Sequence, residues 1–150
     1  MRTRGPEIMT IIGDHIAAAA EKWIGTPFPW QAQVRGVGCD CKGLVAGVAR
    51  DCGRAEADEI EALAADYGAV VDVMRLRAGL DRLFDRVAIS RAGDVLLVRI
   101  GGKAQHLAIA APTAMRPSRA IQALDTGPRQ VIATGVPRAL IAGVYRWKDV

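Results

Sequence analysis

Apolar residues recur in the first third of the chain at the spacing of amphipathic helices. From Pro6 to about Trp23 they stand at every third or fourth position: Met9, Ile12, Ile16, Ala19, Ala20 and Trp23. This period places one apolar stripe on a helix. A second helix is predicted from Asp40 to about Cys52, with Asp40 as its N-cap and Gly53 as its terminator. Its predicted buried stripe comprises Leu44, Val45, Val48 and Cys52.

Glycine and proline separate these two helices, and two further helices follow them. The segment 25–38, GTPFPWQAQVRGVG, predicts a long ordered loop rather than a regular element. Segments 56–68 and 72–87 are typical of helices. In the second of them Val73, Leu76, Leu80 and Leu83 lie on one side, with arginines and aspartates on the other.

The pattern changes to strands at residue 91. Two runs rich in Val, Leu and Ile are separated by Gly101-Gly102, which indicates a two-residue hairpin turn. Segments 119–124, 130–134 and 139–147 supply three more strands. Helices followed by an antiparallel sheet of about five strands predict an α+β fold in one domain spanning residues 1–150.

Composition and charge exclude several classes of function. The 150 residues are 51% hydrophobic and 24% charged, as in an ordinary globular protein. A net charge of +4 suits an anionic partner, but the basic residues are scattered and aromatics are only 5%, which argues against nucleic acid. No apolar run approaches the length of a membrane span. Asp14 and His15 interrupt the N-terminal apolar run, so no signal peptide is expected.

Three cysteines, Cys39, Cys41 and Cys52, leave several interpretations open. Without an export signal the expected compartment keeps thiols reduced, so a disulfide is disfavoured. A metal site lacks the usual C-x-x-C spacing and a fourth ligand, so we expect no metal and no cofactor. A cysteine in a reduced protein is most often a small buried hydrophobe.

Cys41 differs from the other two because it lies in the first turn of a predicted helix. The unpaired N–H groups and the helix dipole there favour a thiolate. A thiolate nucleophile needs a partner such as histidine, and the chain has only His15 and His106. His15 lies within the first helix and is read as structural. A two-residue turn would place His106 opposite Leu97, sharing a face with Ala104 and Ala108. The spacing indicates a Cys–His site, with a structural histidine as the alternative.

Four motifs resemble the NlpC-type cell-wall peptidases, a branch of the papain-like cysteine hydrolases. They are GTPFPW, CDCKGLV, AGDVLLV and QHLAIA, in the family's order and on the expected elements. The resemblance extends from about Ile12 to Trp147 and implies a papain-like NlpC-type domain. CDCKGLV in particular resembles the branch encoded with phage tails and phage-like gene transfer agents, whose small members open the host cell wall.

The resemblance implies a role for each of three residues. Cys41 is the nucleophile, His106 the general base, and Gln122 the polar residue that orients the imidazole. The backbone N–H of Cys41 is the implied oxyanion donor. The implied reaction is thiolate attack on an amide carbonyl, followed by hydrolysis of a thioester.

Departures from the family pattern bear on substrate binding. Phe28 replaces a tyrosine, Gln31-Ala32 replaces two glycines, and Lys42 replaces the serine after the nucleophile. Lys42 favours thiolate and an acidic substrate if it faces the cleft. Trp30 either lines the cleft or belongs to the core. Asp40 is favoured as a helix cap over a support for Cys41. The candidate substrate-binding residues are Phe28, Trp30, Asp40 and Lys42.

The resemblance implies a cysteine hydrolase of peptidoglycan stem peptides, cleaving between D-glutamate and a diamino acid. Its partners would be the peptidoglycan peptide and proteins of a phage tail or tail-like particle. Such a protein is made in the cytoplasm and reaches the cell wall in a particle or after lysis. An amidase or acyltransferase on another N-acyl substrate is one alternative. A non-catalytic tail-tip structural protein is the other.

Overall fold

The computed structural model describes residues 6–29, 32–65, 73–113 and 119–148. The helices of this part of the chain are α1 (Pro6–Glu21), α2 (Cys41–Asp51), α3 (Ala57–Ala65) and α4 (Val73–Leu83). A 3-10 turn, η1, covers Arg138–Leu140. None of the described helices is long and apolar enough to cross a membrane.

The main sheet has six antiparallel strands in the order β3-β8-β4-β5-β6-β7. Its strands are β3 (Phe84–Val87), β4 (Val95–Ile100), β5 (Lys103–Ala110), β6 (Arg119–Ala123), β7 (Val131–Gly135) and β8 (Ile141–Trp147). β1 (Gln33–Val34) and β2 (Gly38–Cys39) form a separate two-stranded ribbon. The prediction of a loop without regular structure over 25–38 is therefore wrong at these positions. The α+β class and the antiparallel sheet are therefore confirmed, with one more strand than expected.

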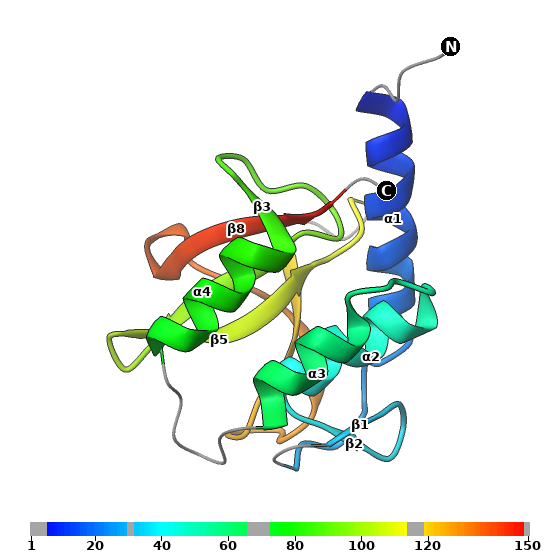
Figure 1. Ribbon diagram of the computed structural model, residues 1–150. Helices are drawn as coiled ribbons and strands as arrows, with labels where there is room; N and C mark the ends of the chain where they lie inside the picture. Colours follow the sequence, from blue (N-terminus) through cyan, green and yellow to red (C-terminus); the bar gives the residue numbers. More distant parts are fainter. Residues whose placement is uncertain (1–5, 30–31, 66–72, 114–118, 149–150) are drawn as a thin grey trace.

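Helices cover one face of the sheet. In Figure 1, α2, α3 and α4 lie in front of the sheet and α1 stands beside it. The larger core cluster joins apolar residues of these helices to alternate residues of the strands, including Val95, Leu97, Leu107, Ile109 and Ile121. Trp23 packs over α2, where a side chain at Gly47 would collide with its ring. This core fixes α2 against the central strands.

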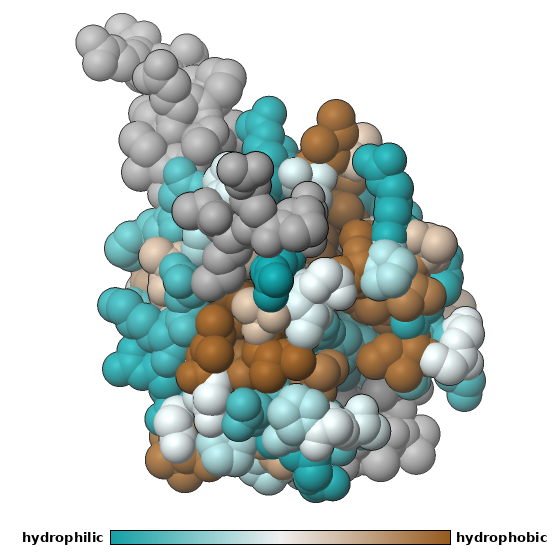
Figure 2. Space-filling view, turned by 180° about the vertical axis from the view of Figure 1, so that it is seen from behind, coloured by the Kyte–Doolittle hydropathy of each residue, from teal (hydrophilic) through white to brown (hydrophobic). Residues whose placement is uncertain are grey.

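The opposite face of the sheet carries a smaller core cluster. Its residues alternate along the strands with those of the larger cluster, because successive side chains of a strand point to opposite faces. They are Leu96, Val98, Ala108, Ala120 and Val144. Figure 2 shows the molecule from behind, where apolar residues gather across the middle of the surface.

The helix predicted over 72–87 is wrong in its last turn. α4 ends at Leu83, and Phe84–Val87 forms β3, which pairs with β8. Phe84 is buried and meets the ring of Trp147 edge-on, with centroids 4.9 Å apart. Pairing with β8 and burial against this partner, both distant in sequence, override the local helical period.

The hairpin of β4 and β5 is confirmed, but its predicted register is wrong. Gly101 and Gly102 both have positive φ, as a tight two-residue turn requires. Past the turn, a β-bulge shifts the pairing, so that His106 lies opposite Val98 instead of Leu97. Arg99 pairs with Ala104, which leaves Gln105 as the extra residue.

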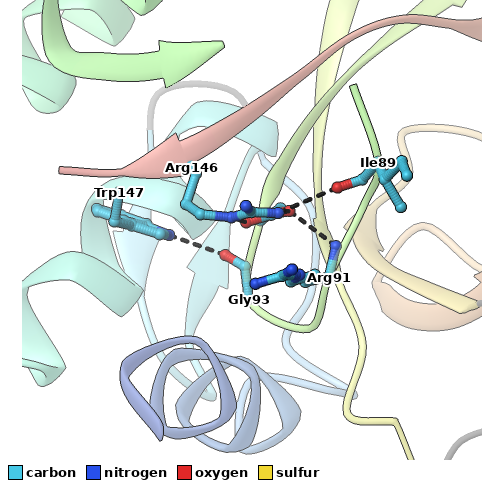
Figure 3. Close-up of polar contacts among 6 residues, drawn as sticks. Ile89, Arg91, Gly93, Arg146 and Trp147 are labelled. Carbon is cyan, nitrogen blue, oxygen red and sulfur yellow. Dashed lines mark hydrogen bonds and ion pairs between the residues drawn. The ribbon is translucent and has the colours of Figure 1, made fainter. Parts of the chain in front are cut away.

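Asp94 anchors the start of β4. Its carboxylate accepts a hydrogen bond from the Arg91 backbone N–H and pairs with Arg146 of β8 at 2.8 Å. Figure 3 shows this cluster, in which Arg146 also reaches the Ile89 carbonyl and the Trp147 indole donates to Gly93. These contacts tie the entry of β4 to β8.

Candidate active site

The N-terminus of α2 is built by its cap. Asp40 has an extended backbone conformation, and its carboxylate accepts a hydrogen bond of 2.7 Å from the Gly43 N–H. The predicted N-cap is therefore confirmed, and Cys41 is the first residue of the helix. The first N–H groups of a helix have no partner within it and carry partial positive charge. The sulfur of Cys41 therefore lies where a negative charge is favoured.

A close backbone contact explains the glycine in the CKG motif. A Cβ atom on Gly43 would lie 1.8 Å from the Ala32 carbonyl oxygen. The same oxygen accepts a hydrogen bond from the Asp40 N–H. Only glycine lets the chain around Ala32 approach the first turn of α2 so closely, and this approach fixes how the helix start is presented.

Cys41 meets β5 where that strand separates from β6. The two strands pair only at Ile109 and Ala110. The side chain of His106 and the backbone N–H of Leu107 lie close enough to the sulfur of Cys41 to lower its pKa. The structure therefore brings Cys41 and His106 together, although 65 positions separate them in sequence.

A chain of hydrogen bonds holds the imidazole from its other side. Nε2 of His106 lies 2.9 Å from Oε1 of Gln122, in β6. Nε2 of Gln122 in turn donates to the hydroxyl of Thr134, in β7. Because the amide oxygen only accepts, Nε2 of His106 is the donor, and Nδ1 is left for the thiol. Gln122 thus occupies the orienting place expected for it.

Lys42 lies inside the site and not on the surface. Its side chain is 1% exposed. Nζ lies 3.4 Å from the Cys41 sulfur and 3.5 Å from the carbonyl oxygen of Gln105. The sequence left open whether Lys42 points to solvent or to the thiol, and the structure places it against the thiol.

The surroundings of the pair favour its charged form. Burial alone would raise the pKa of Cys41, but the Lys42 charge and the hydrogen bond with His106 outweigh it and lower the pKa to about 7. Burial alone would lower the pKa of His106, but the hydrogen bond and charge of Cys41 outweigh it and raise the pKa. A thiolate beside an imidazolium is the form that attacks carbonyl carbon.

The other two cysteines lack this environment. Burial, with the negative charge of Asp40 next in importance, raises the pKa of Cys39 to about 12, so its thiol stays neutral. Cys52 is half-buried at the C-cap of α2, and burial raises its pKa as well. Cys41 therefore differs from both in charge state as well as in position.

The remaining candidate residues fall outside the reacting pair or outside the described chain. Phe28 is buried in the larger core cluster. Asp40 is fully buried as the cap. Trp30 lies outside the described residues. Thr134 and the Gln105 carbonyl were not predicted. Both depend on long-range strand register, on the β6–β7 pairing and on the bulge in β5, which the sequence pattern did not indicate.

Among the described residues, no group of three or more His, Cys, Asp or Glu side chains converges as a metal site would require. A cavity of about 460 Å³ lies elsewhere, lined by His15, Lys22, Arg35 and Asp51 among others. His15 is exposed there.

Comparisons with known proteins place the fold. No family model and no curated protein matches the sequence. The NlpC/p60 domain of the peptidoglycan hydrolase SagA matches the structure with a TM-score of 0.57 and 22% identity, covering 89% of this chain and 97% of that one. The chain has an NlpC/p60 fold.

Two further NlpC/p60 structures agree with this assignment. The P60 domain of an antigen from M. avium paratuberculosis has a TM-score of 0.59 and 16% identity, covering 96% of this chain and 99% of that one. RipD from Mycobacterium tuberculosis has a TM-score of 0.54 and 17% identity, covering 90% and 95%. RipD is described as non-catalytic and adapted to binding peptidoglycan. An NlpC/p60 fold is thus found with and without catalysis, so activity has to be argued from the site.

Proposed function

We propose that this protein is a cysteine hydrolase of peptidoglycan stem peptides. The observation that carries the proposal is the placement of His106 beside the Cys41 thiol, with His106 hydrogen-bonded to Gln122 and Gln122 hydrogen-bonded to Thr134. A nucleophile, a base and an orienting group in this order are the parts that acyl transfer requires. A domain that only binds peptidoglycan has no need for a thiol whose pKa is lowered to about 7.

The proposed reaction needs no group beyond the protein and water. The Cys41 thiolate attacks the amide carbonyl carbon, and the first N–H groups of α2 stabilise the resulting oxyanion. The C–N bond breaks as the His106 imidazolium gives its proton to the leaving nitrogen. Water then attacks the thioester and gives a proton to His106, the C–S bond breaks, and the thiolate returns. The products are an amine and a carboxylic acid.

The bond we propose for cleavage joins D-glutamate to a diamino acid in the stem peptide. The NlpC-type motifs support this choice, and the positive net charge suits peptides that carry free carboxylates. The CDCKGLV motif supports a further proposal, that the protein reaches the cell wall in a phage tail or tail-like particle after synthesis in the cytoplasm. Detection of the protein in purified particles by mass spectrometry would test that placement.

The hydrolase proposal is tested by incubating the purified protein with a muropeptide mixture and identifying products by mass spectrometry. We expect new fragments with a free amine at the diamino acid, and none with Cys41→Ala. Transfer of the acyl group to an added amine would instead favour the acyltransferase alternative. Binding to insoluble peptidoglycan without any product from a folded wild-type protein would favour a non-catalytic role like that described for RipD.

A further inference from the structure

Lys42 combines full burial with direct contact to the candidate nucleophile. Lysine is among the residues least often buried, because an ammonium loses its hydration there. Here 1% of the side chain is exposed, and Nζ lies 3.4 Å from the Cys41 sulfur. A buried cation is tolerated when negative charge and hydrogen-bond acceptors surround it. The contact with a thiolate meets the first condition.

The β-bulge in β5 provides the hydrogen-bond acceptor for the buried ammonium. Gln105 is the extra residue of the bulge, between Ala104, which pairs with Arg99, and His106, which pairs with Val98. Its carbonyl oxygen lies 3.5 Å from Lys42 Nζ. Bulges disrupt ladder pairing and re-aim side chains beside active sites. This bulge therefore serves two groups: it sets the register of His106 and presents an acceptor to Lys42.

We propose that Lys42 is a positioning residue that places a positive charge beside the Cys41 sulfur, so that the thiolate persists when His106 is neutral. The inference rests on the proposed thiolate chemistry and deepens it. In the wild-type protein the charge of Lys42 is the foremost of the influences that lower the pKa of Cys41, ahead of those from His106. Geometry and electrostatics thus agree on the same ammonium.

The charge of Lys42 has a different effect at each stage of the reaction. During acylation the thiolate becomes a thioester sulfur as the C–S bond forms, and His106 passes its proton to the leaving nitrogen. Lys42 then remains beside a neutral sulfur, and its charge opposes reprotonation of His106. His106 is therefore kept neutral, as it must be to accept a proton from the attacking water. When the C–S bond breaks, the departing thiolate regains Lys42 as its counter-charge.

Other charged groups near the thiol do not replace Lys42. The Asp40 carboxylate is negative and caps the helix, and the Cys39 thiol stays neutral. His106 is the titratable neighbour from β5, held by the uncharged amide of Gln122. Arg50, with Asp58 and Glu61 of α3, lies at the opposite end of α2. Asp51, also at that end, accepts from the indole of Trp23.

The test measures alkylation of Cys41 by iodoacetamide as a function of pH, with each cysteine followed separately by peptide mass spectrometry. We expect a wild-type midpoint near pH 7. Lys42→Met should move the midpoint upward and slow alkylation at pH 7 by about fivefold, as a rise of one pKa unit from about 7 implies. Lys42→Arg should restore part of the rate. Lys22→Met, on an exposed lysine of the turn after α1, is the matched control and should leave the midpoint unchanged.

His106→Ala gives a second readout of the same charge, because it removes the imidazole and leaves Lys42 in place. The proposal predicts that adding Lys42→Gln to His106→Ala raises the midpoint of Cys41, whereas adding Lys42→Arg leaves it nearly unchanged. Equal midpoints for His106→Ala and His106→Ala/Lys42→Gln would overturn it, and so would a folded Lys42→Met protein that is alkylated at the wild-type rate at pH 7. Because alkylation uses no peptidoglycan, a failure of the hydrolase proposal leaves this readout intact, and the two outcomes can be told apart.

Discussion

His106 Nε2 lies 2.9 Å from the Gln122 amide oxygen, and this contact joins two strands that pair only at Ile109 and Ala110. The amide oxygen accepts a hydrogen bond but carries no charge. It therefore fixes the tautomer and the direction of the ring, while the stabilisation of an imidazolium falls largely to the Cys41 thiolate. The first three predictions below follow from this division of tasks.

Replacing Gln122 should affect turnover more than folding. In Gln122→Ala the ring loses a neutral hydrogen bond, which contributes about 1 kcal/mol, so kcat should fall by about fivefold to tenfold. Gln122→Glu places a carboxylate behind the ring and should raise the pKa of His106 further. Steady-state kinetics on a stem peptide, with circular dichroism as the folding control, measure both. An unchanged kcat in a folded Gln122→Ala protein would contradict the orienting role.

Replacing Thr134 should lower activity indirectly, through its hydrogen bond with Gln122. Thr134→Val keeps the shape of the side chain but removes the hydroxyl that accepts from the Gln122 amide. The amide is then free to rotate and to present its nitrogen to His106, so kcat should fall severalfold with KM unchanged. Thr134→Ser retains the hydroxyl and should restore activity. Equal activity of the valine and serine variants would show that the amide is held by other contacts.

The dependence of kcat/KM on pH should be bell-shaped. The pKa of Cys41 is lowered to about 7, so activity should rise as the pH increases through about 7 and thiol becomes thiolate. The pKa of His106 is raised, so the alkaline limb, where the imidazolium loses its proton, should lie above the ordinary histidine value. A pH–rate profile on a stem peptide checks both limbs. An acid limb near the ordinary thiol pKa would contradict the described electrostatics.

The cap of α2 should contribute to stability. Asp40→Ala removes the acceptor of the Gly43 N–H and should cost about 1 kcal/mol of unfolding free energy. Asp40→Asn caps nearly as well and should cost little, although it removes a negative charge from beside Cys39 and Cys41. Urea denaturation compares the two variants with the wild type. A larger loss in the asparagine variant would indicate that the charge of Asp40, not its capping, stabilises the fold.

The Asp94–Arg146 ion pair should contribute to the stability of the fold and not to catalysis. Asp94 is 2% exposed, and removing Arg146 would leave its carboxylate buried without a counter-charge, with only the hydrogen bond from the Arg91 N–H remaining among those described. Arg146→Met should therefore destabilise the protein by about 3 kcal/mol, whereas activity per folded molecule should stay near wild type. Thermal unfolding and kinetics on the same sample separate the two effects. A lower kcat at full folding would show that the entry of β4 influences the site.

The sequence predicted those parts of the fold that local pattern determines. The apolar periods gave α1, α2 and most of α4, and the paired glycines gave the β4–β5 turn. The pattern failed where distant partners decide: Phe84 to Val87 became a strand because β8 pairs with it and Trp147 packs on Phe84.

The candidate site was likewise predictable where local pattern determines it and not where distant elements pack together. Cys41 and its cap were predictable because they depend on one helix end. The residue spacing indicated His106 as a partner for Cys41, whereas Gln122 was proposed only through the family resemblance, since no local pattern relates β5, β6 and α2. The bulge at Gln105, the contact with Thr134 and the burial of Lys42 depend on strand register and packing, to which the spacing of residues gives no access.

The most direct test of the central claim uses one defined stem peptide containing a D-glutamyl–diamino acid bond. Wild-type protein and Cys41→Ala are incubated with it at pH 7.5, and the new amine is quantified by mass spectrometry. We predict cleavage at that single bond by the wild type and none above background by the variant. An intact peptide after incubation with folded wild-type protein, or equal cleavage by both proteins, would contradict the claim.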